Sequence, residues 1–137
     1  MSDCVVTVPA RLWQAWIGEG DLPGHEPEYE SHFWLPVLPR IEPGERVYIA
    51  AHGAIRGYAP LVRTEARCVL APSRGCLVRT GGAVAVTVPG LDVVGFRGFR
   101  YRWWERADEV PFPRWKEPTA RVRPVDLAAQ PSLFGGA

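Results

Sequence analysis

The stretch IEPGERVYIAAHGAIRGYA, residues 41–59, decides the fold. Pro43-Gly44 is a turn signal, because proline presets the first corner of a tight turn and glycine accepts the positive φ of the second. The run 47–51 that follows is β-branched, aromatic and small, which is typical of a buried strand. A second tight connection at 52–54 leads into a return strand over 55–63. The stretch therefore predicts two neighbouring strands at the centre of the chain.

Further elements are expected on the N-terminal side of this stretch. Residues 4–8 (CVVTV) form an uninterrupted β-branched run, which predicts a short buried strand. Apolar residues then recur at helical spacing and predict an amphipathic helix over about 9–18, with its tryptophans turned inward. Residues 18–32 are acidic and rich in turn formers, as in a surface loop. Residues 33–38 are apolar but contain Pro36, which favours an edge strand or a lead-in to a strand.

The C-terminal half predicts more strands and one further turn of helix. Strands are expected at 66–70, 76–79 and 83–88, with Gly81-Gly82 as a hairpin turn between the last two. A short helical turn is expected within 104–110, ended by the prolines that follow.

The longest strand is predicted over 93–104. Because side chains alternate along a strand, its aromatic residues would share one face and its arginines the other. The aromatic set is Phe99, Tyr101 and Trp103, and the arginine set is Arg100 and Arg102.

Length and composition predict one β-rich α+β domain. The 137 residues suffice for one hydrophobic core, and 14 Gly with 14 Pro favour short elements joined by turns. From Pro118 onward few residues remain that could pack. We therefore expect a small pseudo-barrel with one or two short helices over residues 1–124, followed by a flexible tail over 125–137.

Cysteine usage and hydropathy bear on the compartment. No apolar run approaches the roughly 20 residues of a membrane helix, and the N-terminus lacks a secretory pattern. An odd count of cysteines (Cys4, Cys68, Cys76) argues for free thiols in a reducing compartment. Neither the cysteines nor the three scattered histidines form the close pairs of a zinc site. We expect a cytoplasmic monomer that has no membrane segment, no metal and no cofactor.

Charge is distributed unevenly although the net charge is only +1. Residues 1–45 carry a balance of −6, whereas residues 46–106 carry +7. All cations in the middle segment are arginines, whose planar guanidinium supports bidentate and stacked contacts to phosphates and bases. A genome rich in G and C would also favour arginine. The middle segment is thus a candidate basic surface.

The order of elements around residues 41–59 resembles the PUA-like superfamily, including its ASCH and EVE branches. The matching positions are Pro43, Gly44, Glu45, Gly53, Ile55, Gly57 and Tyr58. The resemblance covers roughly residues 4–115 and implies a small pseudo-barrel with an aromatic and polar pocket for RNA or modified DNA. Such readers extrude a base from the duplex into the pocket.

This resemblance makes the protein a candidate nucleic-acid binding module. Aromatic side chains can stack on bases while arginines neutralise phosphates. The candidates for base stacking are Trp34, Tyr58, Trp103, Trp104 and Trp115. The candidates for nucleic-acid contacts through phosphates are Arg56, Arg97, Arg100 and Arg102. The competing interpretation is that the tryptophans form the core and the arginines a solvated strand face.

Two other functions compete with nucleic-acid binding. The first is a small ASCH-like hydrolase that acts on a modified nucleoside. Some ASCH proteins are hydrolases, and their amidohydrolase branch uses a lysine in the pocket. The single lysine of this chain, Lys116, lies too late in the sequence for that role, and no hydrolase or P-loop motif is present. No catalytic residue is therefore assigned. The other competitor is an adaptor whose function resides in its tail.

The tail contains a peptide that resembles the bacterial sliding-clamp binding motif. The matching residues are Gln130, Ser132, Leu133 and Phe134, and Pro131 replaces the usual leucine. In such peptides a Leu-Phe pair enters an apolar groove and the glutamine fixes the orientation. Alternatively, Leu133 and Phe134 fold back onto the domain. Docking on a clamp would raise the effective concentration of the domain at DNA, which favours DNA over RNA as the ligand.

Overall fold

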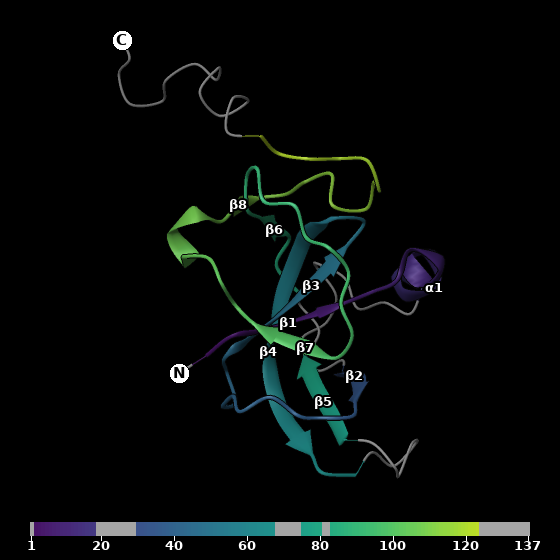
Figure 1. Ribbon diagram of the computed structural model, residues 1–137, viewed down its shortest axis with the longest axis vertical. Helices are drawn as coiled ribbons and strands as arrows, with labels where there is room; N and C mark the ends of the chain where they lie inside the picture. The colour runs from purple at the N-terminus through teal and green to yellow at the C-terminus, as the bar shows by residue number, and fades with distance from the viewer. Residues whose placement is uncertain (1, 19–29, 68–74, 81–82, 124–137) are drawn as a thin grey trace.

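The computed structural model describes residues 2–18, 30–67, 75–80 and 83–123. They form a β-rich α+β fold in which the main sheet curls into a half-barrel, as expected (Figure 1). The strands are β1 (Cys4–Thr7), β2 (Glu30–Leu35), β3 (Arg46–Ala51), β4 (Ala54–Glu65), β5 (Gly75–Thr80), β6 (Val86–Thr87), β7 (Phe99–Tyr101) and β8 (Val110–Pro111). The helical elements are η1 (Ala10–Leu12), α1 (Trp13–Gly18) and η2 (Arg106–Asp108). No helix in these ranges is long and apolar enough to cross a membrane.

The main sheet has the strand order β2-β5-β4-β3-β1-β7. Its centre is the β3–β4 hairpin predicted from residues 41–59, and β1 pairs with β3 in parallel, with Cys4 opposite Val47. The remaining pairs are antiparallel, and β6 and β8 form a separate two-stranded sheet. The sheet thus ends in β2 on one edge and in β7 on the other.

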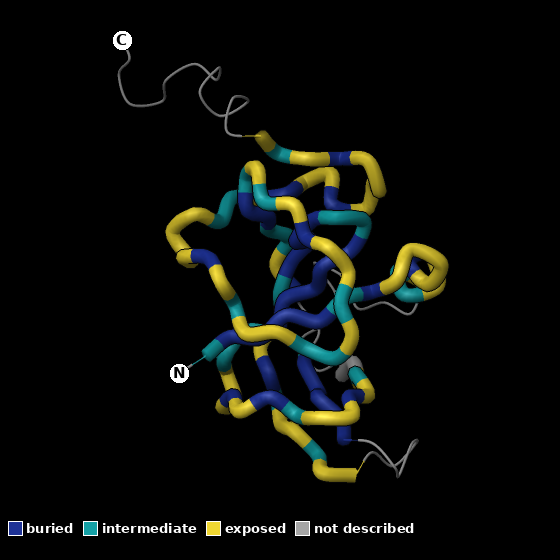
Figure 2. The backbone as a smooth tube through the Cα atoms, in the orientation of Figure 1, coloured by how far each residue is buried: buried dark blue, intermediate teal, exposed yellow. Residues whose placement is uncertain are grey.

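Strands β1 and β3 are covered on both faces, which explains their unbroken apolar sequences. Alternate residues contribute to two hydrophobic clusters. One contains Cys4, Val6, Val47 and Ile49 together with Trp13, Leu35, Leu77, Phe112 and Trp115. The other contains Val5, Tyr48 and Ala50 together with Ile55, Val88, Val93 and Trp104. Figure 2 shows this buried centre beneath a mostly exposed outer chain.

Local turn chemistry at the hairpin agrees with its sequence. Gly44 has φ of 90°, and its N–H donates to the carbonyl of Leu61 at 2.8 Å. Gly57 is required for a different reason: a Cβ there would lie 2.6 Å from the carbonyl oxygen of Val84. This close approach lets Tyr58 and Val84 exchange backbone hydrogen bonds of 3.0 and 2.8 Å.

The strands expected after residue 65 differ from those observed. The predicted strand over 93–104 is wrong except at β7, because β1 offers a register of only three residues, Cys4 to Val6. The predicted hairpin between 76–79 and 83–88 is also wrong: β5 pairs with β2 and β4, whereas β6 pairs with β8. Residues 66–67 are not in a strand, and the rest of the strand expected at 66–70 lies outside the described residues.

The cysteines also require a correction. Cys76 in β5 is disulfide-bonded, with a partner outside the described residues, so the prediction of three free thiols is wrong. Cys4 is a free thiol and is fully buried. Burial raises the pKa of Cys4 to about 12, which leaves it protonated and unreactive.

A buried arginine joins the hairpin to the C-terminal part of the domain. Arg56 in β4 is 2% exposed, and its guanidinium donates to five backbone carbonyls. The acceptors are Ala51 at 2.9 Å, His52 at 3.4 Å, Trp115 at 3.2 Å, Glu117 at 2.9 Å and Pro118 at 3.0 Å. Burial, followed by the charge of Arg121, lowers the pKa of Arg56 to about 10.

We predict that Arg56→Met lowers the free energy of unfolding by about 3 kcal/mol or more, because buried carbonyls lose their donors. Urea unfolding at pH 7 measures this change. The control is Arg114→Met, since Arg114 is 68% exposed and its pair with Glu117 is a surface ion pair. Equal losses in the two variants would show that Arg56 does not hold these segments together.

Candidate functional site

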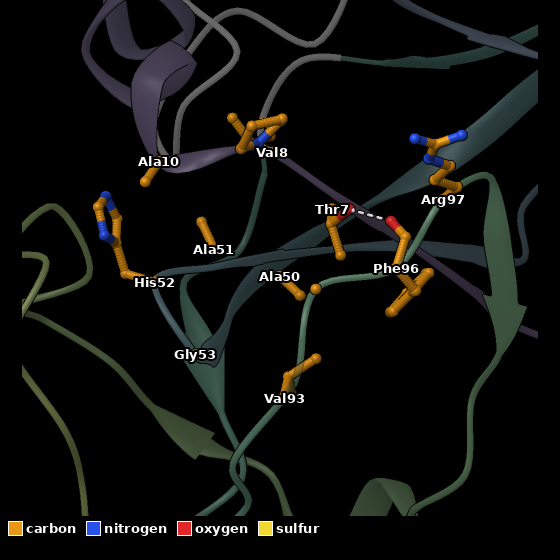
Figure 3. Close-up of a pocket in the computed structure, with 12 residues that line it drawn as sticks. Thr7, Val8, Ala10, Ala50, Ala51, His52, Gly53, Val93, Phe96 and Arg97 are labelled. Atoms are coloured by element: carbon orange, nitrogen blue, oxygen red, sulfur yellow. Dashed lines mark hydrogen bonds between the residues drawn. The ribbon is translucent and has the colours of Figure 1, made fainter.

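A hollow of about 350 Å³ lies where the carboxyl ends of β1 and β3 face the segment 93–97 (Figure 3). We call it the His52 hollow. Ligands often bind outside the carboxyl ends of parallel strands, and β1 and β3 are the parallel pair of this sheet. Its lining is Thr7, Val8, Pro9, Ala10, Ala50, Ala51, His52, Gly53, Val93, Gly95, Phe96 and Arg97.

Two hydrogen bonds hold the segment 93–97 over the sheet. The hydroxyl of Thr7 donates to the carbonyl of Phe96 at 2.9 Å, and the N–H of Val93 donates to the carbonyl of Gly53 at 2.8 Å. The wall of the hollow opposite His52 is therefore fixed although it belongs to no strand. Small and apolar side chains line the interior, and His52 and Arg97 provide its ionisable groups (Figure 3).

The position of His52 is set by its left-handed backbone conformation and by hydrogen bonds from two arginines to its carbonyl. It has φ of 48°, and its carbonyl accepts hydrogen bonds from Arg56 and Arg121. Its imidazole meets the ring of Trp13 edge to face at 5.9 Å between centroids. Burial, then the charges of Arg56 and Arg121, lower the pKa of His52. The imidazole is therefore neutral at pH 7 and offers one hydrogen-bond donor and one acceptor.

A stack of three side chains continues from the rim of the hollow. The guanidinium of Arg100 lies 4.3 Å from the ring centroid of Trp103 and 5.6 Å from that of Phe96. We call these three residues the Arg100 stack. Arg100 is exposed and Trp103 is 38% exposed, so the stack is accessible from solvent. Phe96 belongs to both the stack and the His52 hollow, which makes them one continuous surface.

The structure separates the four arginines predicted to contact phosphates. Arg97 and Arg100 are both exposed; Arg97 lines the hollow and Arg100 belongs to the stack. Arg56 is buried against carbonyls, so it cannot meet a phosphate in this structure. Arg102 forms an ion pair with Asp3 at 2.9 Å and donates a hydrogen bond to the carbonyl of Trp104, so its guanidinium is already paired within the domain.

The five aromatic residues predicted to stack on bases are also separated. Trp103 lies at the site, whereas Trp34 is 48% exposed on the edge strand β2. Trp104 and Trp115 are buried in the two hydrophobic clusters. Tyr58 is half-buried, and the guanidinium of Arg46 covers its ring at 4.0 Å. Trp103 is thus the one of the five that joins the His52 hollow and the exposed arginines.

Beneath the site, a buried carboxylate organises the cluster around Trp104. Glu109 accepts hydrogen bonds from Tyr48, from Trp104 at 2.9 Å and from Arg46 at 2.9 Å. Burial, followed by the hydrogen bond to Glu109, raises the pKa of Tyr48. Because the donors of Arg46, Tyr48 and Trp104 are all hydrogen-bonded to Glu109, they hold Trp104 in position and are not available to hydrogen-bond a ligand.

Asp3 organises the neighbouring strands in the same way. Its buried carboxylate accepts from Arg102, from Arg106 at 2.8 and 2.9 Å, and from the N–H of Arg46. Burial alone would raise the pKa of Asp3, but these hydrogen bonds bring it below its ordinary value. Asp3 therefore joins the start of β1 to β3 and to the segment after β7.

Sequence reasoning missed His52, Thr7 and Phe96 as site residues. The signal for His52 was present, because a histidine before glycine in a tight connection is suited to positive φ. Thr7 and Phe96 carry no local signal, since their contact joins residues 89 positions apart. The predicted tail contacts at Gln130, Ser132, Leu133 and Phe134 lie outside the described residues.

The residues that line the His52 hollow include no carboxylate, cysteine or lysine. Within the described ranges, no three His, Cys, Asp or Glu side chains are grouped to hold a metal ion. The groups offered here are an apolar interior, a neutral imidazole, an arginine and an exposed aromatic stack. The chain matches no protein-family model, curated protein or solved structure at a significant level.

We predict that His52 titrates at lower pH in the folded protein than in the unfolded chain, for which about 6.5 is the ordinary value. Because the pKa of His52 is lower in the folded state, the unfolded chain binds the proton more readily. The free energy of unfolding therefore falls as the pH drops below about 6.5. NMR titration of the imidazole in buffer and in urea measures both values. His52→Asn, which tolerates positive φ, should remove this part of the pH dependence. A folded pKa at or above the unfolded value would contradict the placement of His52.

Proposed function

We propose that this protein is a nucleic-acid binding module of PUA-like type. The observation that carries the proposal is the Arg100 stack, an exposed aromatic and guanidinium surface that continues into the His52 hollow. Stacking on aromatic rings and on guanidinium planes is the physical basis of binding to unpaired bases. Arg97 and Arg100 supply the positive charge that phosphates require.

The His52 hollow suits one extruded base. Its volume of about 350 Å³ falls within the range of roughly 300–1,000 Å³ of small-molecule pockets. A planar base would have apolar contacts with Val8 and Val93, while the neutral imidazole hydrogen-bonds its edge. Arg97 at the rim would then meet the backbone phosphate next to the extruded nucleotide. The lining of the hollow includes no carboxylate, cysteine or lysine, which favours binding over an ASCH-like hydrolysis.

The proposal predicts that Trp103→Ala weakens oligonucleotide binding by about 1–3 kcal/mol and that Arg97→Ala weakens it about 3- to 10-fold. Fluorescence anisotropy with single- and double-stranded oligonucleotides, with and without modified bases, measures affinity at two salt concentrations. Affinity should fall as salt rises, and Arg97→Ala should reduce the slope by about one.

Arg114→Ala is the matched control, because Arg114 is exposed and lines neither the hollow nor the stack. It should lower affinity much less than Arg97→Ala does. An equal effect of the two substitutions would show nonspecific attraction to net charge. Binding that does not change with salt, or no binding to any oligonucleotide, would contradict the proposal itself.

We further propose that the tail docks on a bacterial sliding clamp through Gln130, Ser132, Leu133 and Phe134. Clamps encircle DNA, so this partner favours DNA over RNA as the ligand. We predict that the double substitution of Leu133→Ala and Phe134→Ala abolishes clamp binding in a pulldown and leaves oligonucleotide affinity unchanged. If the intact protein and the variant bind the clamp equally, or if neither binds, the tail has another role.

A further inference from the structure

A second hollow, separate from the His52 hollow, lies between the turn 88–91 and the segment 102–108. It has a volume of about 680 Å³ and is lined by Val88, Pro89, Gly90, Leu91, Arg102, Trp103, Trp104, Glu105 and Asp108. We call it the Glu105 hollow. Both of its walls are fixed: the N–H of Leu91 donates to Val88 at 3.1 Å, and that of Asp108 donates to Glu105 at 2.9 Å.

The charge of this hollow is negative once its internal pairs are counted. Arg102 is the cation of the lining, and it forms an ion pair with the buried Asp3 at 2.9 Å. Arg106, on η2, shares the single charge of Asp3 with Arg102, and it does not line the hollow. The carboxylates of Glu105 and Asp108 are exposed and form no hydrogen bond or ion pair with any residue that the structure describes. With Arg102, Arg106 and Asp3 counted together, Glu105 and Asp108 leave a net charge of −1 around the hollow.

The other lining groups suit an elongated ligand better than a bare ion. Val88, Leu91 and the indole of Trp103 provide apolar surface that an alkyl stem can cover. The indole N–H of Trp103 has no partner among the described residues and can donate to a carbonyl. The same ring already carries the guanidinium of Arg100 at 4.3 Å, so stacking of a guanidinium on Trp103 occurs within the molecule itself.

We propose that the Glu105 hollow binds an arginine side chain of a basic peptide. The guanidinium forms charge-assisted hydrogen bonds to Glu105 and Asp108, its stem lies on Leu91 and Trp103, and a peptide carbonyl accepts from the indole. This partner site is independent of the nucleic-acid binding proposed above. The two ligands have opposite charge and use different residues apart from Trp103, which belongs both to the Arg100 stack and to the lining of the Glu105 hollow.

The test is isothermal titration of the full chain with Gly-Gly-Arg-Gly-Gly and, as the uncharged counterpart, Gly-Gly-Gln-Gly-Gly. We expect the arginine peptide to bind at least 5-fold more tightly. The double substitution of Glu105→Gln and Asp108→Asn should remove at least that factor, whereas Glu42→Gln, at an exposed carboxylate outside the hollow, should not. Thermal unfolding of each variant establishes that it is folded.

Three results would overturn the proposal: equal affinity for the two peptides, unchanged affinity in the double variant, or equal affinity for guanidinium ion alone, which would indicate a small-cation site. Oligonucleotide binding by the double variant separates the two proposals. Because Glu105 and Asp108 are outside the nucleic-acid surface, that binding should persist when peptide binding is lost. Loss of both in a folded variant would mean that the two surfaces are not distinct.

Discussion

The guanidinium of Arg56 is the constraint on which the other features of this domain depend. It is buried, and it donates to backbone carbonyls on two segments about 60 residues apart in the chain. It also lies 5.1 Å from the ring centroid of Phe112 and 5.9 Å from that of Trp13. One segment is the β3–β4 turn with His52, and the other is 115–118, whose Trp115 closes a hydrophobic cluster. The same contact therefore completes the core and positions one wall of the His52 hollow.

Two buried carboxylates act in a comparable way on the other side of the sheet. Asp3 ties β1 to the arginines after β7, and Glu109 ties Tyr48 to Trp104. Each carboxylate satisfies several donors, so the aromatic and cationic side chains of this region are held in place. The surfaces open to a ligand are the Arg100 stack, the His52 hollow and the Glu105 hollow, which borders these networks through Arg102 and Trp104.

The central hairpin could be predicted because its information is local. Pro43-Gly44 and Gly53 specify turns whatever the rest of the chain does, and the apolar runs between them specify strands. The segment 93–104 has an equally regular alternation, but a strand also needs a partner, and β1 is only four residues long. Its other residues instead close the hollow and form the stack, which no alternation pattern encodes.

The role of each arginine was equally hidden from the sequence. Positions 56 and 100 are both simply arginine in the sequence. In the structure, Arg56 donates to carbonyls within residues 115–118, whereas Arg100 is exposed to solvent and stacks on Trp103. Such a difference arises from contacts between distant segments, which composition and spacing do not record. The disulfide at Cys76 was not predicted either, because an odd count of cysteines favours free thiols although it still allows one disulfide.

The central claim is that nucleic-acid binding is confined to the His52 hollow and the Arg100 stack. Amide NMR spectra recorded during titration with a short single-stranded oligonucleotide test it residue by residue. The predicted result is that shifts concentrate at Thr7, His52 and residues 93–103 and leave β2, β5 and residues 105–118 unchanged. Shifts centred on β2 around Trp34, or spread evenly over all exposed arginines, would contradict the claim.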